Sequence, residues 1–283
     1  MTTFSKVVRT YEKECDKKDI PSETVMAYLT ELSQRERYNL YLHFEEEMPV
    51  ELEKEFKAGM DRILNYEPME HVLGYSWFYG YQMIVNEDVL IPRPETEELC
   101  ANILATMDSR CKENKEIVCA DIGTGSGAIG IVLASEESKV KMIATDISEE
   151  ALVTAKKNAE NNHVNIDFYA GDMLKPLIDR NIKLDVLISN PPYIPQEEKM
   201  EKSVVDFEPH VALFGGEDGL FFYKQIFKDC KKVLKDKAFM AFEMGWDQRE
   251  RMSALVEEML PDCTYEILKD MNGKDRMLFV YFD

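Results

Sequence analysis

The apolar positions in the first 75 residues recur at helical spacing. One stripe consists of Val25, Met26, Leu29 and Leu32, and another of Leu52, Phe56, Met60, Ile63 and Leu64. Pro21-Ser22-Glu23 marks the start of the first of these helices, and Ser33 is expected to cap the next one. The pattern predicts a small all-helical domain over residues 1–75, which packs against or docks a partner and carries no chemistry of its own.

Between Trp77 and Ile91 the pattern changes. Aromatic and β-branched residues surround Gly80 and the turn-forming run Asn86-Glu87-Asp88, a combination that favours a β-hairpin. We expect residues 76–92 to form a hairpin connector between the helical domain and the rest of the chain.

Beyond the connector, short apolar runs alternate with helical patterns. The expected strands are 116–121, 139–145, 165–170, 183–189 and 237–243, and the expected helices are 127–136, 148–162, 218–234 and 247–259. Strands separated by helices predict an α/β domain over residues 93–283, with a mostly parallel sheet and helices on both faces. Strands 263–269 and 275–282 flank a turn signal, so one antiparallel strand is expected at the edge of the sheet.

A glycine-rich loop follows the first strand of this domain. The segment Asp121-Ile122-Gly123-Thr124-Gly125-Ser126-Gly127 leads into an apolar helical stretch. Glycines allow backbone angles closed to other residues and let a ligand lie against the main chain. The spacing D-x-G-x-G-x-G is typical of loops that bind S-adenosylmethionine. Because Gly123, Gly125 and Ala128 also fit the dinucleotide pattern G-x-G-x-x-A, a dinucleotide or a structural turn remains an alternative.

Two carboxylates follow the next two strands. Asp146 ends a strand 21 residues beyond Gly125, where a carboxylate can accept both hydroxyls of a ribose. Asp172 follows strand 165–170, where it could accept the exocyclic amine of adenine. An ordinary helix N-cap is an equally good interpretation of Asp172.

The tetrapeptide Asn190-Pro191-Pro192-Tyr193 follows strand 183–189, at the edge where open α/β sheets bind ligands. The prolines fix the backbone and hold the preceding carbonyls outward, so the Asn190 side-chain oxygen and the Pro191 carbonyl could accept the two hydrogens of a planar NH₂ group. Such a nitrogen is a poor nucleophile because its lone pair is delocalised. Catalysis would then consist of holding the nitrogen in position to attack the methyl group of a sulfonium. Tyr193 would pack against the flat substrate group, which makes Asn190, Pro191 and Tyr193 the catalytic candidates.

These motifs resemble the release factor glutamine methyltransferases, the HemK/PrmC family, over essentially the whole chain. The resemblance also rests on Glu70-His71-Val72-Leu73-Gly74, on Ile91-Pro92-Arg93-Pro94-Glu95-Thr96-Glu97, and on Phe207-Glu208-Pro209 followed by Ala212-Leu213-Phe214-Gly215-Gly216-Glu217-Asp218-Gly219-Leu220. It implies a class I S-adenosylmethionine-dependent methyltransferase fold behind a helical N-terminal domain. The implied reaction methylates the side-chain amide nitrogen of the glutamine in the Gly-Gly-Gln motif of class-1 peptide chain release factors, with S-adenosyl-L-homocysteine as the product.

The resemblance also assigns residues. The implied cofactor-binding residues are Gly123, Thr124, Gly125, Ser126, Gly127, Asp146, Asp172, Met173 and Asn190, and the implied substrate-binding residues are Asn190, Pro191, Pro192 and Tyr193. The family often has an aromatic residue at the position of Met173, so a thioether contact to adenine is expected here. The Pro92-Arg93-Pro94 turn either leads rigidly into a helix near Glu95 or frames the cofactor pocket.

Composition and charge limit the partners. With 34 basic and 54 acidic residues the net charge is −20, which opposes binding to a phosphate backbone, so no direct nucleic-acid contact is expected. No apolar run approaches the ~20 residues of a membrane span, which predicts a cytoplasmic protein without a membrane partner. The six cysteines include no CxxC pair and the four histidines share no ligand spacing, so reduced thiols and no metal are expected.

Three rival functions stay open on the residues alone. An adenine-amino methyltransferase acting on nucleic acid would use the same tetrapeptide, although the acidic charge speaks against it. A glutamine methyltransferase acting on a ribosomal protein would differ only in substrate contacts. A non-catalytic S-adenosylmethionine sensor would have no use for the acceptors of Asn190-Pro191-Pro192-Tyr193.

Overall fold

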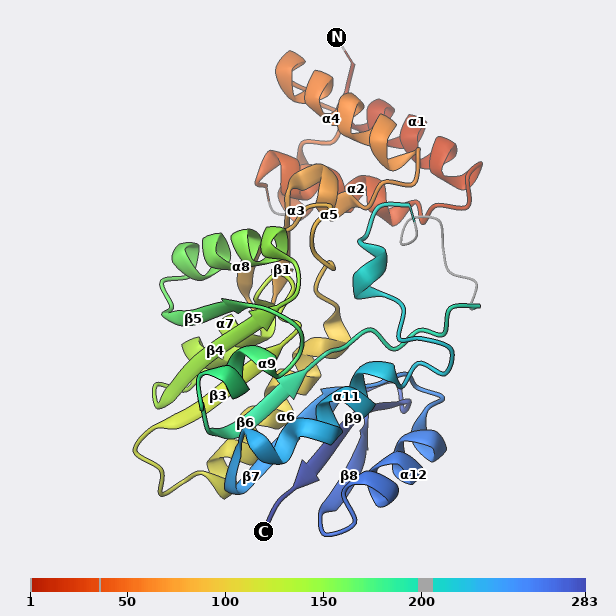
Figure 1. Ribbon diagram of the computed structural model, residues 1–283. Coiled ribbons are helices and arrows are strands. Elements are labelled where there is room, and N and C mark those ends of the chain that lie inside the picture. Colours follow the sequence, from red (N-terminus) through yellow and green to blue (C-terminus); the bar gives the residue numbers. More distant parts are fainter. Residues whose placement is uncertain (1, 36, 198–205) are drawn as a thin grey trace. The chain divides into compact units, whose positions relative to one another are not determined.

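The computed structural model describes residues 2–35, 37–197 and 206–283 (Figure 1). The described residues form two compact units: the first consists of residues 2–35 and 37–75 together with 206 and 207, and the second of residues 76–197 and 208–283. None of the helices in these ranges has the length and apolar character of a membrane-spanning segment.

The N-terminal unit is built from helices, as the pattern predicts. Its helices are α1 (Phe4–Asp16), α2 (Glu23–Ser33), α3 (Arg37–Leu42), α4 (Val50–Ile63) and α5 (Met69–Leu73). The rings of Tyr28 and Phe56 stack in the core of this unit, with their centroids 5.6 Å apart. Gly59 admits this packing, because a Cβ at that position would lie 1.9 Å from the Tyr28 hydroxyl oxygen.

One local prediction in this unit is wrong, and a second is right only in part. Ser33 is the last residue of α2 and its hydroxyl donates to the carbonyl of Thr30, so it caps no following helix. The run Glu45-Glu46-Glu47, whose charges suggest a solvated helix face, lies instead after α3 has ended at Leu42. All three of these glutamates are exposed.

The hairpin is confirmed but is shorter than predicted. Strands β1 (Tyr75–Phe78) and β2 (Tyr81–Ile84) are joined by Tyr79 and Gly80, which have φ angles of 53° and 82°. Two central residues with positive φ are typical of the tight turn that matches the twist of paired strands. The buried side chain of Asn158 bonds both main-chain groups of Ile84, so the hairpin is anchored to the α/β unit.

The second unit is the predicted α/β domain. Its sheet has the order β5-β4-β3-β6-β7-β9-β8, and the strands are β3 (Ile117–Ile122), β4 (Val140–Asp146), β5 (Ile166–Ala170), β6 (Leu184–Ser189), β7 (Leu234–Glu243), β8 (Thr264–Lys269) and β9 (Asp275–Tyr281). Strands β3 to β7 pair in parallel. The strand that reverses is β9, which lies one position in from the edge between β7 and β8.

Alternating side chains supply a core on each face of the sheet. On β3, Ala120 and Ile122 join one apolar cluster and Ile117 and Cys119 join the other, as the two-residue period of a strand requires. The first cluster is covered by α9 (Lys175–Asp179), α11 (Phe221–Asp229) and α12 (Arg249–Met259); the second is covered by α6 (Pro94–Arg110), α7 (Ala128–Glu136) and α8 (Glu149–Asn161). This is the class I methyltransferase architecture expected from the sequence.

The predicted helix 218–234 is too long at both ends. Gly219 has a φ of 71°, a left-handed conformation that does not continue a helix. α11 therefore starts at Phe221, and a short 3₁₀ turn, Cys230–Lys232, leads into β7 at Leu234.

The strand order sets the place of a binding site. From β3 the chain moves outward to β4 and β5 and then returns to β6 on the other side of β3. Ligands of open α/β sheets bind beyond the carboxyl ends of the strands at such a reversal. The carboxyl ends of β3 and β6 carry the glycine loop and Asn190, respectively.

Candidate active site

A cavity opens at the carboxyl ends of β3, β4 and β6. It encloses about 960 Å³, including the solvent at its mouth, a size suited to a small-molecule ligand. Of the predicted site residues, Gly123, Thr124, Gly125, Ser126, Asp146, Met173, Asn190 and Pro192 line it. The sequence thus identified residues from four separate segments that share one cavity.

The glycine loop forms the floor of this cavity. Gly123 and Gly125 have φ angles of 71° and 54°, and a Cβ built on either residue meets no atom within 4 Å, so side chains there would occupy the cavity itself. Gly127 has a different role, because a Cβ would lie 3.2 Å from that of Ala155 on α8. The main-chain cradle left by these glycines fits a ligand that lies directly against the backbone, as S-adenosylmethionine would.

Asp121 holds the glycine loop through a hydrogen bond from Thr124. It is buried at the end of β3, and one carboxylate oxygen accepts a hydrogen bond from Thr124 Oγ1 at 2.6 Å. The other oxygen has no hydrogen-bond partner among the described residues. Burial raises the pKa of Asp121 to about 6, so its negative charge is poorly stabilised by the protein alone.

Asp146 both lines the cavity and fixes the loop. One of its oxygens accepts from the Gly125 main-chain nitrogen at 2.8 Å, and the other accepts from that of Ser148 at 3.0 Å. Burial raises the pKa of this carboxyl group. The sequence pattern predicts the position of Asp146 but not its bond to the loop. Each of its oxygens retains a lone pair that could accept a ribose hydroxyl.

Asp172 and Met173 are placed differently from each other. Met173 has a φ of 42° and lies in the lining of the cavity. Asp172 is exposed and is outside that lining. The residue that precedes α9 as its cap is Leu174, without a side-chain cap bond, so the alternative of Asp172 as the N-cap is wrong. Its proposed contact to adenine stays a prediction.

The tetrapeptide after β6 divides between cavity and core. Asn190 and Pro192 line the cavity, whereas Pro191 and Tyr193 are outside its lining. The Tyr193 side chain packs against the core, and its hydroxyl donates to Glu243 Oε1 at 3.3 Å. The carbonyl of Tyr193 accepts from Gln248 Nε2 at 3.1 Å. The expected packing of Tyr193 against a substrate stays a prediction.

Glycines pack closely against this tetrapeptide. A Cβ on Gly215 would lie 2.4 Å from the Pro192 carbonyl oxygen, and a Cβ on Gly219 would lie 2.3 Å from that of Tyr193. Both glycines belong to a segment that carried the family resemblance without an assigned role. The structure gives them one, because only glycine lets the two loops approach this closely.

An ion pair that the sequence did not predict joins two segments at the cavity wall. Glu208, which is buried, forms an ion pair with Arg93 and accepts from the Ile91 main-chain nitrogen at 3.1 Å. Arg93 and Pro209 both line the cavity. The Pro92-Arg93-Pro94 turn therefore has both of the predicted roles: it leads into α6, which begins at Pro94, and it borders the cavity.

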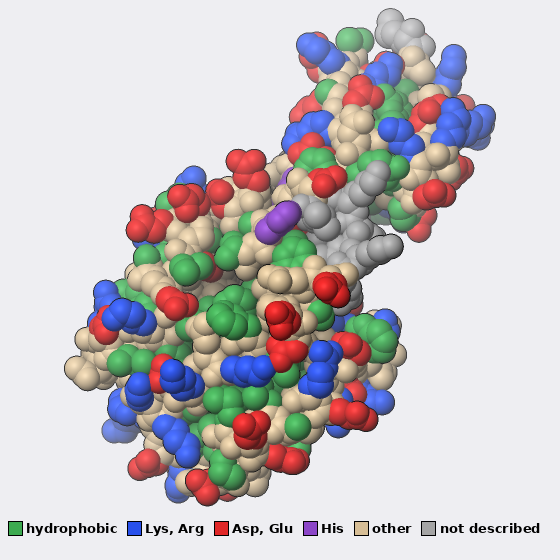
Figure 2. All heavy atoms as spheres, turned by 45° about the vertical axis from the view of Figure 1, so that its right-hand side comes forward, with side chains coloured by type: hydrophobic (Ala, Val, Ile, Leu, Met, Phe, Trp, Pro, Cys, Tyr) green, Lys and Arg blue, Asp and Glu red, His purple; other side chains and the backbone are tan. Residues whose placement is uncertain are grey.

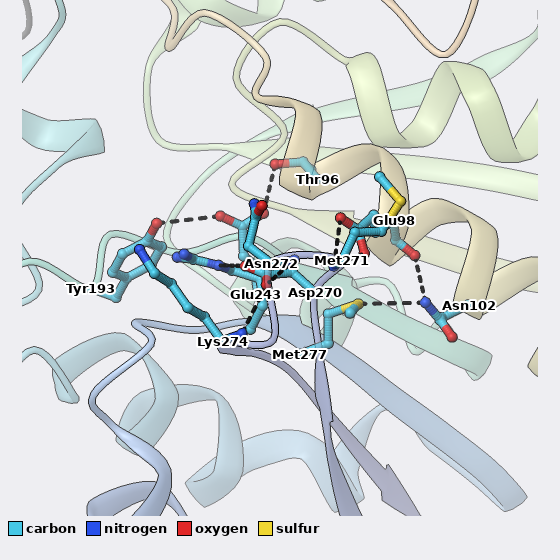
Figure 3. A network of polar contacts seen from close by, with 11 residues as sticks. Thr96, Glu98, Asn102, Tyr193, Glu243, Asp270, Met271, Asn272, Lys274 and Met277 are labelled. Atoms are coloured by element: carbon cyan, nitrogen blue, oxygen red, sulfur yellow. Dashed lines mark hydrogen bonds and ion pairs between the residues drawn. The ribbon is translucent and has the colours of Figure 1, made fainter.

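A polar network lies beside the tetrapeptide (Figure 3). Thr96, in the first turn of α6, donates to Glu243 Oε2 at 2.5 Å, and Asn190 Nδ2 donates to Thr96 Oγ1 at 3.4 Å. Glu243 ends β7 and is 2% exposed. The only signal that could have identified Glu243 from the sequence is a carboxylate at the end of a buried apolar strand.

We expect Asp121→Asn to remove an electrostatic cost while keeping an acceptor for Thr124. The pKa of Asp121 is about 6 in the fold against 3.8 normally, so the folded chain holds this proton more tightly and the wild type loses stability as pH rises from about 4 to above 6. We therefore compare the free energy of unfolding of the variant with that of the wild type at two pH values. The difference in favour of the variant should be about 1 kcal/mol larger at pH 8 than at pH 5. Denaturant unfolding at both pH values measures this, and a difference that does not change with pH would contradict it.

Comparison with known proteins agrees with this site. Residues 7–74 match the PrmC N-terminal domain and residues 100–236 match the Methyltransferase small domain. The chain is 42% identical over 245 residues to a release factor glutamine methyltransferase of Bacillus anthracis, with 86% of each chain covered. It is 40% identical over 270 residues to that of Bacillus subtilis, which covers 95% of this chain and 93% of the relative.

The fold is also found among solved structures. A methyltransferase from Pyrococcus furiosus is similar with a TM-score of 0.53 and 18% identity, over 80% of this chain and 98% of that chain, a likeness that concerns the fold alone. The resemblance inferred from the sequence motifs is confirmed by the curated relatives. This chain belongs to the release factor glutamine methyltransferase family.

Proposed function

We propose that this protein methylates the side-chain amide nitrogen of the glutamine in the Gly-Gly-Gln motif of class-1 release factors. It is an S-adenosylmethionine-dependent methyltransferase that acts on release factor glutamine. The single observation that carries the residue-level proposal is that Asn190 and Pro192 line the same cavity as the glycine loop and Asp146. A nitrogen held at Asn190 would thus face a cofactor held by the loop. The rival substrates, a ribosomal protein or nucleic acid, are not favoured by the named relatives.

The cofactor-binding residues are proposed from their place in the cavity. The main chain of Gly123–Gly127 would hold the cofactor, Asp146 would accept from its ribose, and Met173 would contact its adenine through a thioether. S-adenosylmethionine, when bound, supplies a methyl group activated by the positive charge of its sulfonium. The carboxylates of Asp121 and Asp146 place negative charge at this end of the sheet, which favours a cationic ligand.

Catalysis in this proposal is positioning. The lone pair of a glutamine amide is delocalised, so the nitrogen must be held close to the methyl group and in a fixed orientation. The Asn190 side-chain oxygen and the Pro191 carbonyl would accept the two amide hydrogens. The tetrapeptide is suited to this task because Gln248, Gly215 and Gly219 hold its backbone from behind.

Asp146→Ala should weaken binding of S-adenosylmethionine by about 1.5–3 kcal/mol, because a charged acceptor is lost from a partly enclosed site. Calorimetric titration of the cofactor measures the effect. Asp172→Ala is the matched control at the second predicted carboxylate, which is exposed, and should lose less. Unchanged affinity of the Asp146 variant would remove it from the cofactor site.

Asn190→Ala should reduce the methylation rate at least ~100-fold, while the affinity for S-adenosylmethionine falls far less, because the variant misplaces the amide nitrogen. Mass spectrometry of the Gly-Gly-Gln peptide, which gains one methyl group, follows the rate. Turnover near that of the wild type would exclude Asn190 from the mechanism and leave the orienting role to main-chain carbonyls.

The helical unit, residues 1–75, is proposed to dock the release factor. It carries 10 basic and 16 acidic residues, and the whole chain has a net charge of −20. Figure 2 shows acidic side chains interspersed with basic ones over the visible face. A release factor approaches ribosomal RNA and should carry basic surface, and an acidic enzyme would meet it faster. Avoidance of direct nucleic-acid contact and a cytoplasmic location stay predictions.

Glu45 accepts from Ser5 Oγ at 3.1 Å and Glu46 contacts His43 at 2.9 Å, and glutamine can keep an acceptor at both positions. Replacing Glu45, Glu46 and Glu47 by glutamine should reduce kcat/KM for a whole release factor and leave that for a short Gly-Gly-Gln peptide unchanged, because the lost charge would attract only the protein partner. Methylation of both substrates at about 50 and 300 mM salt measures this, a range over which the Debye length falls roughly two-fold. Equal losses on peptide and protein would mean that these three glutamates only support the fold, and rates independent of salt would exclude electrostatic steering.

A further inference from the structure

Three polar side chains from distant parts of the chain form a short series beside the cavity. Asn190 follows β6, Thr96 lies in the first turn of α6, and Glu243 ends β7. Asn190 and Thr96 line the cavity, whereas Glu243 lies behind them and is buried. Figure 3 shows Thr96, Glu243 and Tyr193 directed toward one another at this point.

The direction of the hydrogen bonds in this series follows from counting protons. An ionised carboxylate only accepts, so the single proton of the Thr96 hydroxyl is donated to Glu243, at 2.5 Å. The Thr96 oxygen can then only accept from Asn190. The atom of Asn190 that faces it, at 3.4 Å, is therefore the NH₂ nitrogen, and the amide oxygen lies on the other side of the group.

The charged form of Glu243 has support from several elements. Burial raises the pKa of Glu243 overall, and hydrogen bonds from Thr96 and Tyr193 together with the charge of Arg276 on β9 offset this only in part. Glu95, the like charge on α6, also raises the pKa. Two hydroxyl donors and a nearby guanidinium are what a buried carboxylate requires in order to stay an acceptor.

We infer that Thr96 and Glu243 are positioning residues that fix the orientation of the Asn190 amide, so that its oxygen and not its NH₂ group is presented to the glutamine nitrogen. This inference rests on the proposed role of Asn190. A flipped Asn190 would place NH₂ against NH₂, two donors without an acceptor, and the substrate amide would be repelled. Thr96 and Glu243 need no contact with the substrate in this role.

The test measures methylation of a Gly-Gly-Gln peptide by full-length variants. Thr96→Val, which keeps the shape and removes the hydroxyl, should lower kcat at least ~10-fold with little change in cofactor affinity. Thr96→Ser retains the hydroxyl and should restore the rate to within about three-fold. Thr96→Ala repeats the measurement if the valine variant folds poorly.

A double-mutant cycle separates this role from simple support of the fold. If Thr96 acts through Asn190, adding Thr96→Val to Asn190→Ala should cause no further loss of rate. Tyr223→Phe is the matched control: it removes a buried hydroxyl that donates to the main-chain carbonyl of Glu243 at 2.7 Å and should lower stability without lowering kcat.

The outcomes that overturn the inference are distinct from those that overturn the proposed function. Equal rates for the valine and serine variants, or losses at Thr96 and Asn190 that multiply in the double variant, would show that Thr96 does not orient Asn190, while Asn190 itself keeps its role. Near-normal turnover of Asn190→Ala alone would overturn the role of Asn190 and the orientation inference together.

Discussion

The buried carboxylate of Glu243 is the interaction on which the arrangement of the active site depends. It accepts from Thr96 on α6 and from Tyr193 after β6, so one side chain at the end of β7 joins three elements that are remote in sequence. A buried carboxylate without donors would be strongly destabilising. Moving Thr96 or Tyr193 away would leave the buried carboxylate without a donor, which is unfavourable, so both side chains stay in place. Because Tyr193 belongs to the tetrapeptide, its bond to Glu243 also fixes the tetrapeptide.

The same physical logic recurs along the carboxyl edge of the sheet. Asp121 is the penultimate residue of β3, and Asp146 and Glu243 end β4 and β7; burial raises the pKa of each of them. Asp121 and Asp146 hold the glycine loop, while Glu243 holds Thr96 and Tyr193, on the side where we propose that the substrate binds. The fold thus has a cost in stability at these three carboxylates, and it has acceptors fixed in advance beside the cavity that we propose binds a cationic cofactor.

The loops around the tetrapeptide add a steric constraint to this electrostatic one. Gly215 and Gly219 allow their segment to lie against the carbonyls of Pro192 and Tyr193, and Gln248 donates to the Tyr193 carbonyl from behind. Arg93 and Glu208 join two further segments at the cavity wall. A backbone surrounded in this way can orient a weak nucleophile, which is the task that methylation of an amide nitrogen sets.

The features that can be read from the sequence are those that depend on the spacing of apolar residues and on short motifs. The glycine loop, Asp146 and the tetrapeptide could be placed at strand ends because the two-residue and 3.6-residue periods mark strands and helices, and parallel strands end at one edge. The prediction failed where a local signal was ambiguous, as with Ser33 at the end of α2. The antiparallel pairing of the last two strands was predicted correctly, but the pattern could not show that β9 lies between β7 and β8. Only the tertiary structure revealed Glu243, whose partner Thr96 is 147 residues away. The place of Glu243 at the end of an apolar strand is visible in the sequence, but its burial and its donors exist only once distant strands and helices have packed together.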